Sequence, residues 1–433
     1  MPPPSGPRAA FLRGITRNVV ALGVVSFLTD VSSELLVYVI PLYLANVLAA
    51  TPTVIGLIEG IAESVAAFVK LASGAISDRI ARRRALVGIG YGASVAAKAL
   101  YLAAATWPVV LVARVGDRIG KGIRTAPRDA LIADSTPADA RGRAFGLHRA
   151  MDTAGAVVGV GLAAVIIDLT QGGDALITAE TFRLLALAAL VPGVLAVMVV
   201  ALGVRDVPRP VANLGGRDRA AVAVPPAPGA AAAQPRGVGR FPAAFWIFVL
   251  ATGLFTLGNS SDAFVALRSQ SLGVGVRDLM LVVVAFNVVD ALIAWPMGAL
   301  SDRVGRRRLI ALAWGLYALA YAGFALAGGP DVVIWLWLLY GAYYGVNEAV
   351  GRALVADLAR PEQRATAYGI VNAVAGLAIL PASVIAGLLW DGVGHAAPFW
   401  FGSACAALGV LLLAFVRPPR VTHAADALMG PRS

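Results

Sequence analysis

The chain has 433 residues, of which 59% are hydrophobic and only 14% are charged. Soluble domains carry about a quarter charged residues, so this composition and the mean hydropathy of +0.78 exclude an ordinary soluble enzyme or nucleic-acid-binding protein. The net charge of +11 comes from arginines that cluster between apolar segments, which is typical of membrane topology. The single cysteine, Cys405, excludes an intrachain disulfide, and three widely spaced histidines predict no metal site.

Twelve segments are long and apolar enough to cross a membrane, since a spanning helix needs about 20 mainly apolar residues. They are residues 18–44, 53–77, 85–105, 107–132, 144–168, 182–203, 243–267, 278–300, 308–327, 331–355, 366–390 and 396–416. Most connecting arginines follow the even-numbered segments, which predicts that both termini are cytoplasmic. We therefore predict an all-α membrane protein of 12 transmembrane helices in two six-helix bundles, residues 1–204 and 241–433. Residues 205–240, rich in Ala, Pro, Gly and Arg, form a predicted flexible cytoplasmic linker between them.

The two predicted bundles share a repeated motif. Residues 73–84 read SGAISDRIARRR and residues 297–308 read MGALSDRVGRRR, which places Asp302 224 residues after Asp78. A second match, of Asp134 with Asp357, has an offset of 223 residues. Parallel repeats of six helices are found in secondary transporters whose halves rock about a site near the membrane midplane.

The duplicated motif resembles the loop signature of major facilitator superfamily transporters, Gly-x-Leu-x-Asp-Arg-x-Gly-Arg-Arg, and the resemblance covers essentially the whole chain. The second copy matches in full, whereas the first has Ile76 and Ala81 in place of Leu and Gly. The resemblance implies a latch in these loops, in which Asp78 and Asp302 bond near a helix end of the opposite half. The implied latch residues are Gly74, Asp78, Arg79, Arg82, Gly298, Asp302, Arg303 and Arg306. The alternative is that they only enforce a tight turn and the correct topology.

Charged residues recur along segment 107–132. At about 100° per residue, Arg114, Asp117, Arg118 and Lys121 share one face, which cannot contact lipid. We predict that this face lines a central path. Carboxylates of the first two segments, Asp30, Glu34, Glu59 and Glu63, are available as partners. The substrate-path candidates are Lys98, Asp117, Lys121, Asp152, Asp262, Tyr340, Tyr344 and Glu348.

Proton coupling is predicted at the same face. Arg118 and Gly122 are similar to the family's span-four signature, Arg-x-x-x-Gly, and the resemblance implies a role for Arg118 in proton transfer. A desolvated carboxylate holds its proton and a nearby arginine opposes this. Movement of Asp30 relative to Arg114 or Arg118 would therefore load and release a proton, with Glu34 as a second titrating group. The alternative is a static ion-pair network.

Three glycines of segment 144–168, Gly146, Gly155 and Gly159, partly resemble the antiporter signature of proton-driven drug exporters. The signature continues with Pro and two Gly, where this chain has Val160, Ala163 and Ala164. These glycines indicate either an antiporter or a plain packing face.

These features favour a proton-coupled secondary transporter that exports a small organic or amphiphilic compound across a bacterial inner membrane. We expect a monomer whose partners are its substrate, protons and membrane lipids, with no nucleic acid and no cofactor beyond the proton gradient. One alternative is uptake of an organic anion held by Lys98, Arg114, Arg118 and Lys121. Another is translocation of a lipid-like substrate. No nucleophile–base pair, metal-ligand cluster or phosphate loop predicts an enzyme.

Overall fold

The computed structural model describes residues 14–79, 82–137, 140–172, 174–207, 241–360 and 363–416, and all regular secondary structure in these ranges is helical. Residues 208–240, most of the predicted linker, lie outside the described residues. The first half contains α2 (Arg17–Val37), α3 (Val39–Asn46), α4 (Pro52–Arg79), α5 (Arg83–Ala99), the 3-10 helix η1 (Leu100–Ala103), α6 (Trp107–Asp134), α7 (Arg141–Gln171) and α8 (Ala179–Gly203). The second contains α9 (Ala243–Gly258), α10 (Asp262–Ser271), α11 (Val276–Val304), α12 (Arg306–Leu326), η3 (Pro330–Val332), α13 (Val333–Leu358), α14 (Arg364–Gly392) and α15 (Ala397–Phe415).

Helices occupy all twelve segments predicted from hydropathy, with ends shifted by a few residues. Within the described ranges, eight helical stretches are long and apolar enough to cross a membrane. The helices α4, α6, α11 and α13 are 28, 28, 29 and 26 residues long but lie outside that set. In α4 and α6 the reason is visible in the sequence, because charged residues recur along both helices.

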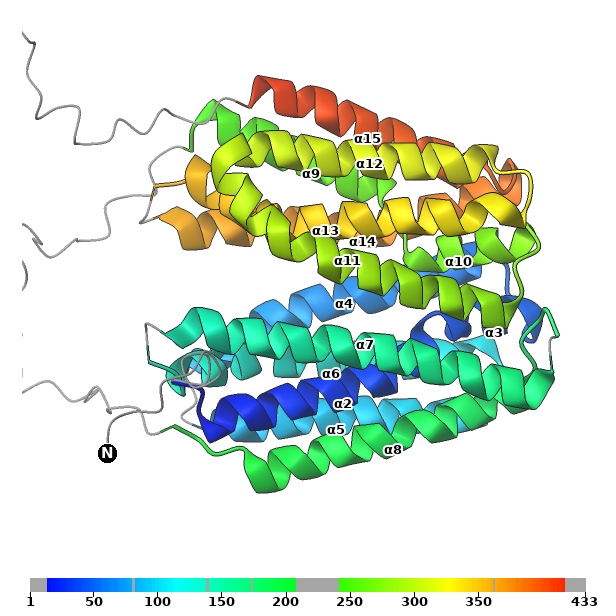
Figure 1. Ribbon diagram of the computed structural model, residues 1–433, viewed down its shortest axis with the longest axis horizontal. Coiled ribbons are helices and arrows are strands. Elements are labelled where there is room, and N and C mark those ends of the chain that lie inside the picture. Colours follow the sequence, from blue (N-terminus) through cyan, green and yellow to red (C-terminus); the bar gives the residue numbers. More distant parts are fainter. Residues whose placement is uncertain are drawn as a thin grey trace, which may run out of the picture.

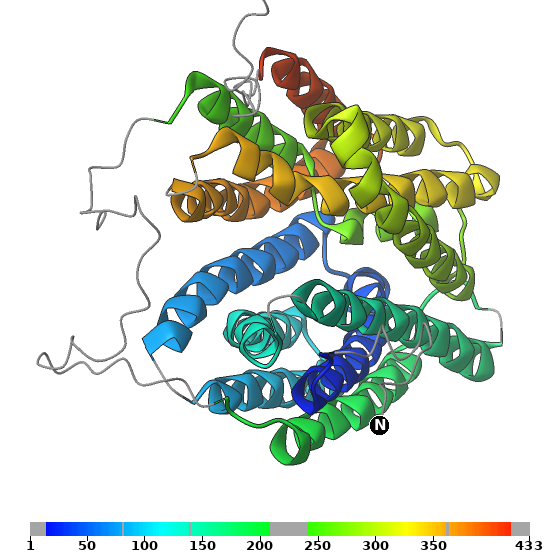
Figure 2. The same ribbon diagram turned by 60° about the vertical axis from the view of Figure 1, so that its left-hand side comes forward.

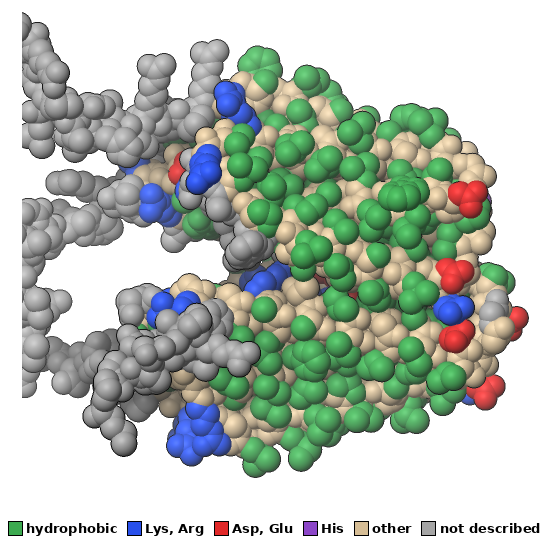
Figure 3. Space-filling view, in the orientation of Figure 1, with side chains coloured by type: hydrophobic (Ala, Val, Ile, Leu, Met, Phe, Trp, Pro, Cys, Tyr) green, Lys and Arg blue, Asp and Glu red, His purple; other side chains and the backbone are tan. Residues whose placement is uncertain are grey.

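The helices form two bundles, α2–α8 and α9–α15. The second lies above the first in Figure 1, and Figure 2 shows the same two bundles from another side. We call the end where α2 begins at Arg17 and α15 ends at Phe415 the terminal end, and the opposite end the far end. On the face shown in Figure 3, most Lys and Arg side chains lie at the terminal end and most acidic side chains at the far end.

The two bundles contact each other mainly through α4 with α14 and α7 with α11. Gly56 and Gly387 allow the first contact, because a Cβ on Gly56 would collide with the Ser383 carbonyl and one on Gly387 would lie 2.5 Å from Thr53 Cα. The Thr53 amide and hydroxyl donate to Asp391 Oδ2 at 3.0 and 2.5 Å. These contacts form a seal between the halves at the far end.

The second far-end contact joins the end of α7 and the loop after it to the start of α11. The Val276 amide donates to the Ala175 carbonyl at 3.2 Å, and Arg277 Nε lies 3.1 Å from Asp168 Oδ1. At the terminal end, by contrast, Figure 3 shows the molecule hollowed between the halves, with Lys or Arg side chains inside the opening. The described structure is therefore closed at the far end and open at the terminal end.

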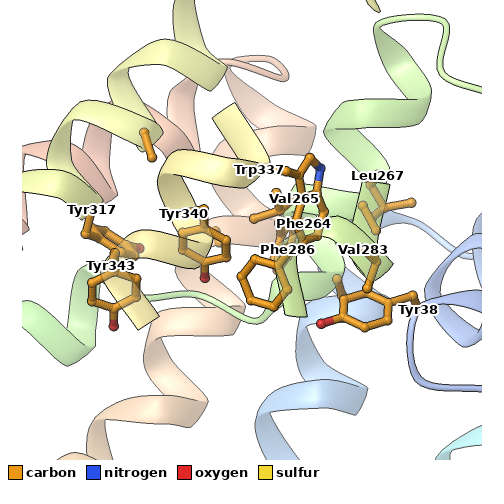
Figure 4. Close-up of a cluster of buried hydrophobic side chains, with 14 of the residues drawn as sticks. Tyr38, Phe264, Val265, Leu267, Val283, Phe286, Tyr317, Trp337, Tyr340 and Tyr343 are labelled. Carbon is orange, nitrogen blue, oxygen red and sulfur yellow. The ribbon is translucent and has the colours of Figure 1, made fainter. Parts of the chain in front are cut away.

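Aromatic side chains fill the second bundle beside the contact between the halves. Phe286 packs against Trp337, Tyr340 and Tyr344, with ring centroids 5.4, 5.7 and 5.4 Å apart. Tyr38 of the first bundle meets Trp337 edge-on, with ring centroids 6.0 Å apart. Both side chains belong to the cluster drawn in Figure 4. This cluster gives the cavity described below a rigid aromatic side.

The predicted segment 243–267 is interrupted, which sequence periodicity did not predict. α9 ends at Gly258 and α10 begins at Asp262, with three polar residues between them. The Ser261 hydroxyl caps α10 by accepting from the Ala263 amide at 3.3 Å. Within a membrane-spanning segment, non-helical backbone is tolerated where it lines a cavity. Residues 259–261 line the cavity described below.

Candidate functional site

A cavity of about 290 Å³ lies between the two bundles. Both halves contribute to its wall. Its lining residues are Val37, Tyr38, Glu59, Glu63, Arg114, Arg118, Asn259, Ser260, Ser261, Asp262, Ala263, Tyr344, Ile379 and Ser383.

Two ion pairs join α4 and α6 along the first-half wall. Arg114 donates from Nε and Nη2 to the two oxygens of Glu59, at 3.0 and 2.8 Å, and both side chains are buried. One helical turn nearer the terminal end, Arg118 Nε lies 2.9 Å from Glu63 Oε1. The Glu63 side chain remains 37% exposed, so this pair faces the cavity.

The sequence predicts that Asp30 changes its proton affinity by moving relative to Arg114 or Arg118, whereas in this structure both arginines are paired with carboxylates of α4. Glu59 and Glu63 are four residues apart, as are Arg114 and Arg118, so adjacent helices can match both pairs at once. This equal spacing of four residues is the feature of the sequence that could have identified Glu59 and Glu63 as the partners. The sequence offers Glu59 and Glu63 as partners of the charged face, but the predicted proton-coupling and substrate-path residues do not include them.

The second-half wall carries Asp262 at the start of α10. Its carboxylate accepts hydrogen bonds from the Tyr340 hydroxyl at 2.7 Å and from the Tyr344 hydroxyl at 3.3 and 3.2 Å. Among the described residues, no Lys or Arg forms an ion pair with it. The structure thus brings together three residues that the sequence singled out separately. Glu348 lies outside the described side chains.

Asp117 and Lys98 lie within the first bundle and are absent from the described wall of the cavity. Lys98 is buried and donates to the hydroxyls of Ser32 and Ser33 at 2.8 and 2.9 Å. Asp117 is buried on the face of α6 toward α5, where Lys98 and Arg124 are among its charged neighbours. The charged face of α6 is therefore divided, with Arg114 and Arg118 toward the cavity. Lys121 is exposed.

Asp30 is half-buried on α2, away from the described wall of the cavity. Its charged neighbours are Asp152 of α7, Lys121 and Arg124 of α6, and Glu34 one turn further along α2. Asp152 Oδ2 lies 3.5 Å from Nδ1 of the buried His148. Asp30 and Asp152 thus belong to a second polar cluster, nearer the terminal end than the cavity.

The glycines of α7 lie where α2 crosses it. A Cβ on Gly155 would lie 2.5 Å from the Phe27 carbonyl oxygen and 3.1 Å from Asp30 Cβ. One on Gly159 would lie 2.7 Å from the Val31 carbonyl oxygen and 3.0 Å from Glu34 Cβ. Two of the three signature glycines thus allow close helix packing directly beside the two carboxylates, whereas nothing lies within 4 Å of a Cβ on Gly146.

The repeated motif leads into an ion pair in each half. Arg83 Nη1 lies 2.5 Å from Asp134 Oδ2, and Arg306 Nη1 lies 2.6 Å from Asp357 Oδ1. In the second copy, Gly305 makes the turn with φ +95°, a conformation that favours glycine. Of the other predicted latch residues, Gly74 lies in α4 and Arg82 and Arg303 are exposed. The side chains of Asp78, Arg79, Gly298 and Asp302 lie outside the described set.

Two helical bundles around a shared polar cavity, sealed at one end, define a transporter-like membrane protein, and comparison with known proteins identifies the family. The Major Facilitator Superfamily model matches residues 22–267 and 259–431, and the chain belongs to this family of transporters. An uncharacterized MFS-type transporter of Methanocaldococcus jannaschii is 32% identical over 410 residues, which cover 93% of this chain and 96% of the relative.

Two further comparisons concern part of the sequence and the fold. The quinolone resistance protein NorA of Staphylococcus aureus is 27% identical over 142 residues, 33% of this chain and 36% of that protein. The crystal structure of a bacterial homologue of the human lysosomal transporter Spinster, in an inward-facing and unoccupied conformation, matches with a TM-score of 0.69. That match has 18% identity and covers 95% of this chain and 96% of the other.

Proposed function

We propose that this chain is a proton-coupled secondary transporter that exports a small organic or amphiphilic compound from the bacterial cytoplasm by alternating access. In this proposal twelve helices cross the inner membrane, both termini are cytoplasmic, and the protein acts as a monomer. The observation that carries the proposal is the central cavity, because both halves build its wall and the described contacts of Thr53 with Asp391 and of Arg277 with Asp168 join them at the far end. The open terminal end then faces the cytoplasm, where an exporter collects its substrate.

Export is favoured over uptake of an organic anion because the basic residues that would hold the anion already have partners within the protein. Arg114 is held by both oxygens of Glu59, Arg118 is paired with Glu63, and Lys98 donates to two serine hydroxyls. An anion would have to displace a buried carboxylate to reach the first two, and breaking a buried pair is costly. Similarity to a protein named for quinolone resistance also supports export.

Proton coupling is proposed at Asp30, with Glu34 as a second group. Asp30 lies between Asp152 of α7 and the cations Lys121 and Arg124 of α6. Lys98 of α5 also interacts with it electrostatically. A change in the tilt of α2 against α7 would alter the balance between these like and opposite charges, and hence proton affinity. The crossing at Gly155 allows the two backbones to remain close during such a change.

The test expresses wild type, Asp30→Asn and an empty vector in an efflux-deficient bacterial host, with untargeted mass spectrometry of cells and medium. A compound depleted inside and enriched outside only with wild type establishes export and identifies a substrate. Asp174→Asn is the matched control, because this exposed far-end loop residue removes the same charge from the same half. Accumulation inside the cells, or export by Asp30→Asn with full dependence on the pH gradient, contradicts the proposal.

A further inference from the structure

The cavity wall combines aromatic rings with a carboxylate whose described side-chain partners are hydroxyl groups. The described lining includes three carboxylates, Glu59, Glu63 and Asp262, and two guanidinium groups, those of Arg114 and Arg118. The first two carboxylates are neutralised by the two arginines at 2.8 and 2.9 Å. When all five groups are ionised, one negative charge is left over, and it lies on Asp262.

Among the residues whose side chains the structure describes, none supplies a positive charge to Asp262 through an ion pair. The Tyr340 and Tyr344 hydroxyls orient the carboxylate, but a neutral donor compensates a charge less well than a cation does. A charge withdrawn from water without an ionic partner is costly, and a positive group that enters the cavity would compensate the charge of Asp262. The backbone break at residues 259–261 leaves this carboxylate at the cavity wall rather than within a continuous helix.

The rings beside Asp262 also suit a cation. Tyr344 and Tyr38 both line the cavity, and behind them Phe286 and Trp337 form the aromatic cluster of Figure 4. Aromatic faces attract cations through the ring quadrupole, most strongly where water is excluded. Asn259 and Ser261 add polar groups on the same side of the cavity. The volume of about 290 Å³ restricts the ligand to a small molecule.

We infer that the cavity binds a small monovalent organic cation, preferably an aromatic one, with its positive group against Asp262 and its apolar part against Tyr38 and Tyr344. This inference rests on the proposed function, since it identifies the substrate class of the same central site. It also distinguishes the two halves, with the substrate charge held in the second half and the proposed proton group, Asp30, in the first.

The experiment measures equilibrium binding to purified full-length protein in lipid nanodiscs, without any gradient. The probes are phenyltrimethylammonium and benzenesulfonate, which have a similar size and opposite charge. Wild type is expected to bind the cation at least tenfold more tightly than the anion, and Asp262→Asn is expected to weaken cation binding at least tenfold. Asp331→Asn, which removes an exposed acid of the same half, is expected to bind as wild type does.

Two tyrosine variants separate charge recognition from loss of fold. Tyr344→Phe keeps the ring and the carboxylate and is expected to retain cation binding, whereas Tyr344→Leu removes the ring and is expected to weaken it. Equal affinity for the two ions, no binding of either, or unchanged cation binding by Asp262→Asn would overturn the inference. Because these measurements involve no transport, such a failure leaves export and proton coupling to their own test.

Discussion

Arg83 lies 2.5 Å from Asp134, and 223 residues further along the chain Arg306 lies 2.6 Å from Asp357. The two ion pairs occupy equivalent places, each joining the helix after the repeated motif to the end of the next helix. The motif itself repeats with an offset of 224, from Asp78 to Asp302. The motif aligns without a gap through its three final arginines, so the ion pair uses the second of these arginines in the first half and the first of them in the second half.

The buried pair of Arg114 and Glu59 is expected to be essential as a pair. Arg114→Gln leaves a buried carboxylate without its bidentate donor, and such losses cost roughly 3 to 5 kcal/mol of stability. Glu59→Gln should do the same in reverse, and the double variant should recover much of the loss. Thermal unfolding of the purified protein checks this, with Arg183→Gln as an exposed arginine control. Additive losses in the double variant would argue against coupling between the two side chains.

The crossing of α2 and α7 is expected to tolerate no side chain at Gly155. Gly155→Ala places a Cβ 2.5 Å from the Phe27 carbonyl oxygen, so the helices must separate. Overpacking of this kind costs roughly 1 to 3 kcal/mol. Gly161→Ala is the matched control on the same helix, because nothing lies within 4 Å of its Cβ. Unfolding temperature and export should both fall for Gly155→Ala only. Equal behaviour of the two variants would show that the crossing is not a tight contact.

The seal at the far end is expected to open during transport. With Cys405 replaced by Ser, Thr53→Cys and Asp391→Cys together should allow crosslinking across the contact between Thr53 and Asp391. The crosslinked protein should stay open at the terminal end and lose export, and reduction should restore it. Each single cysteine variant serves as a control for the substitutions. Full export by the crosslinked protein would mean that the two halves need not separate there.

Lys98 is expected to support the first bundle rather than hold an anionic substrate. Lys98→Met should destabilise the protein, because it removes a charged neighbour of the buried Asp117 and the donor to Ser32 and Ser33. Adding Asp117→Asn should restore part of that stability by removing the unpaired charge. Unfolding temperatures and the profile of exported compounds are the readouts. A changed compound profile at unchanged stability would favour a direct role in substrate binding.

Much of the fold follows from hydropathy and repetition, because apolar runs of about 20 residues force helices and the repeated motif defines equivalent halves. The break before Asp262 was not predicted, since residues 259–261 contain no proline and apolar residues continue on both sides. In the structure these three residues line the shared cavity, a tertiary feature that local sequence does not encode.

The candidate site was predicted in part for a related reason. Spacing of four residues showed that Arg114 and Arg118 share a face, but periodicity within one helix does not identify the helix opposite. The structure supplies that neighbour as α4, with Glu59 and Glu63. The convergence of Tyr340 and Tyr344 on Asp262 likewise depends on how α13 packs beside α10, which local sequence does not encode.

Proton-coupled export is tested most directly in everted membrane vesicles with an acidic interior that is reported by a quenched pH-sensitive dye. The added probe is the compound that the cellular experiment finds to be exported. With wild type, its addition should release protons from the vesicles and reverse the quenching, and Asp30→Asn and empty-vector vesicles should show no change. No reversal with wild type, or equal reversal with Asp30→Asn, would contradict the account.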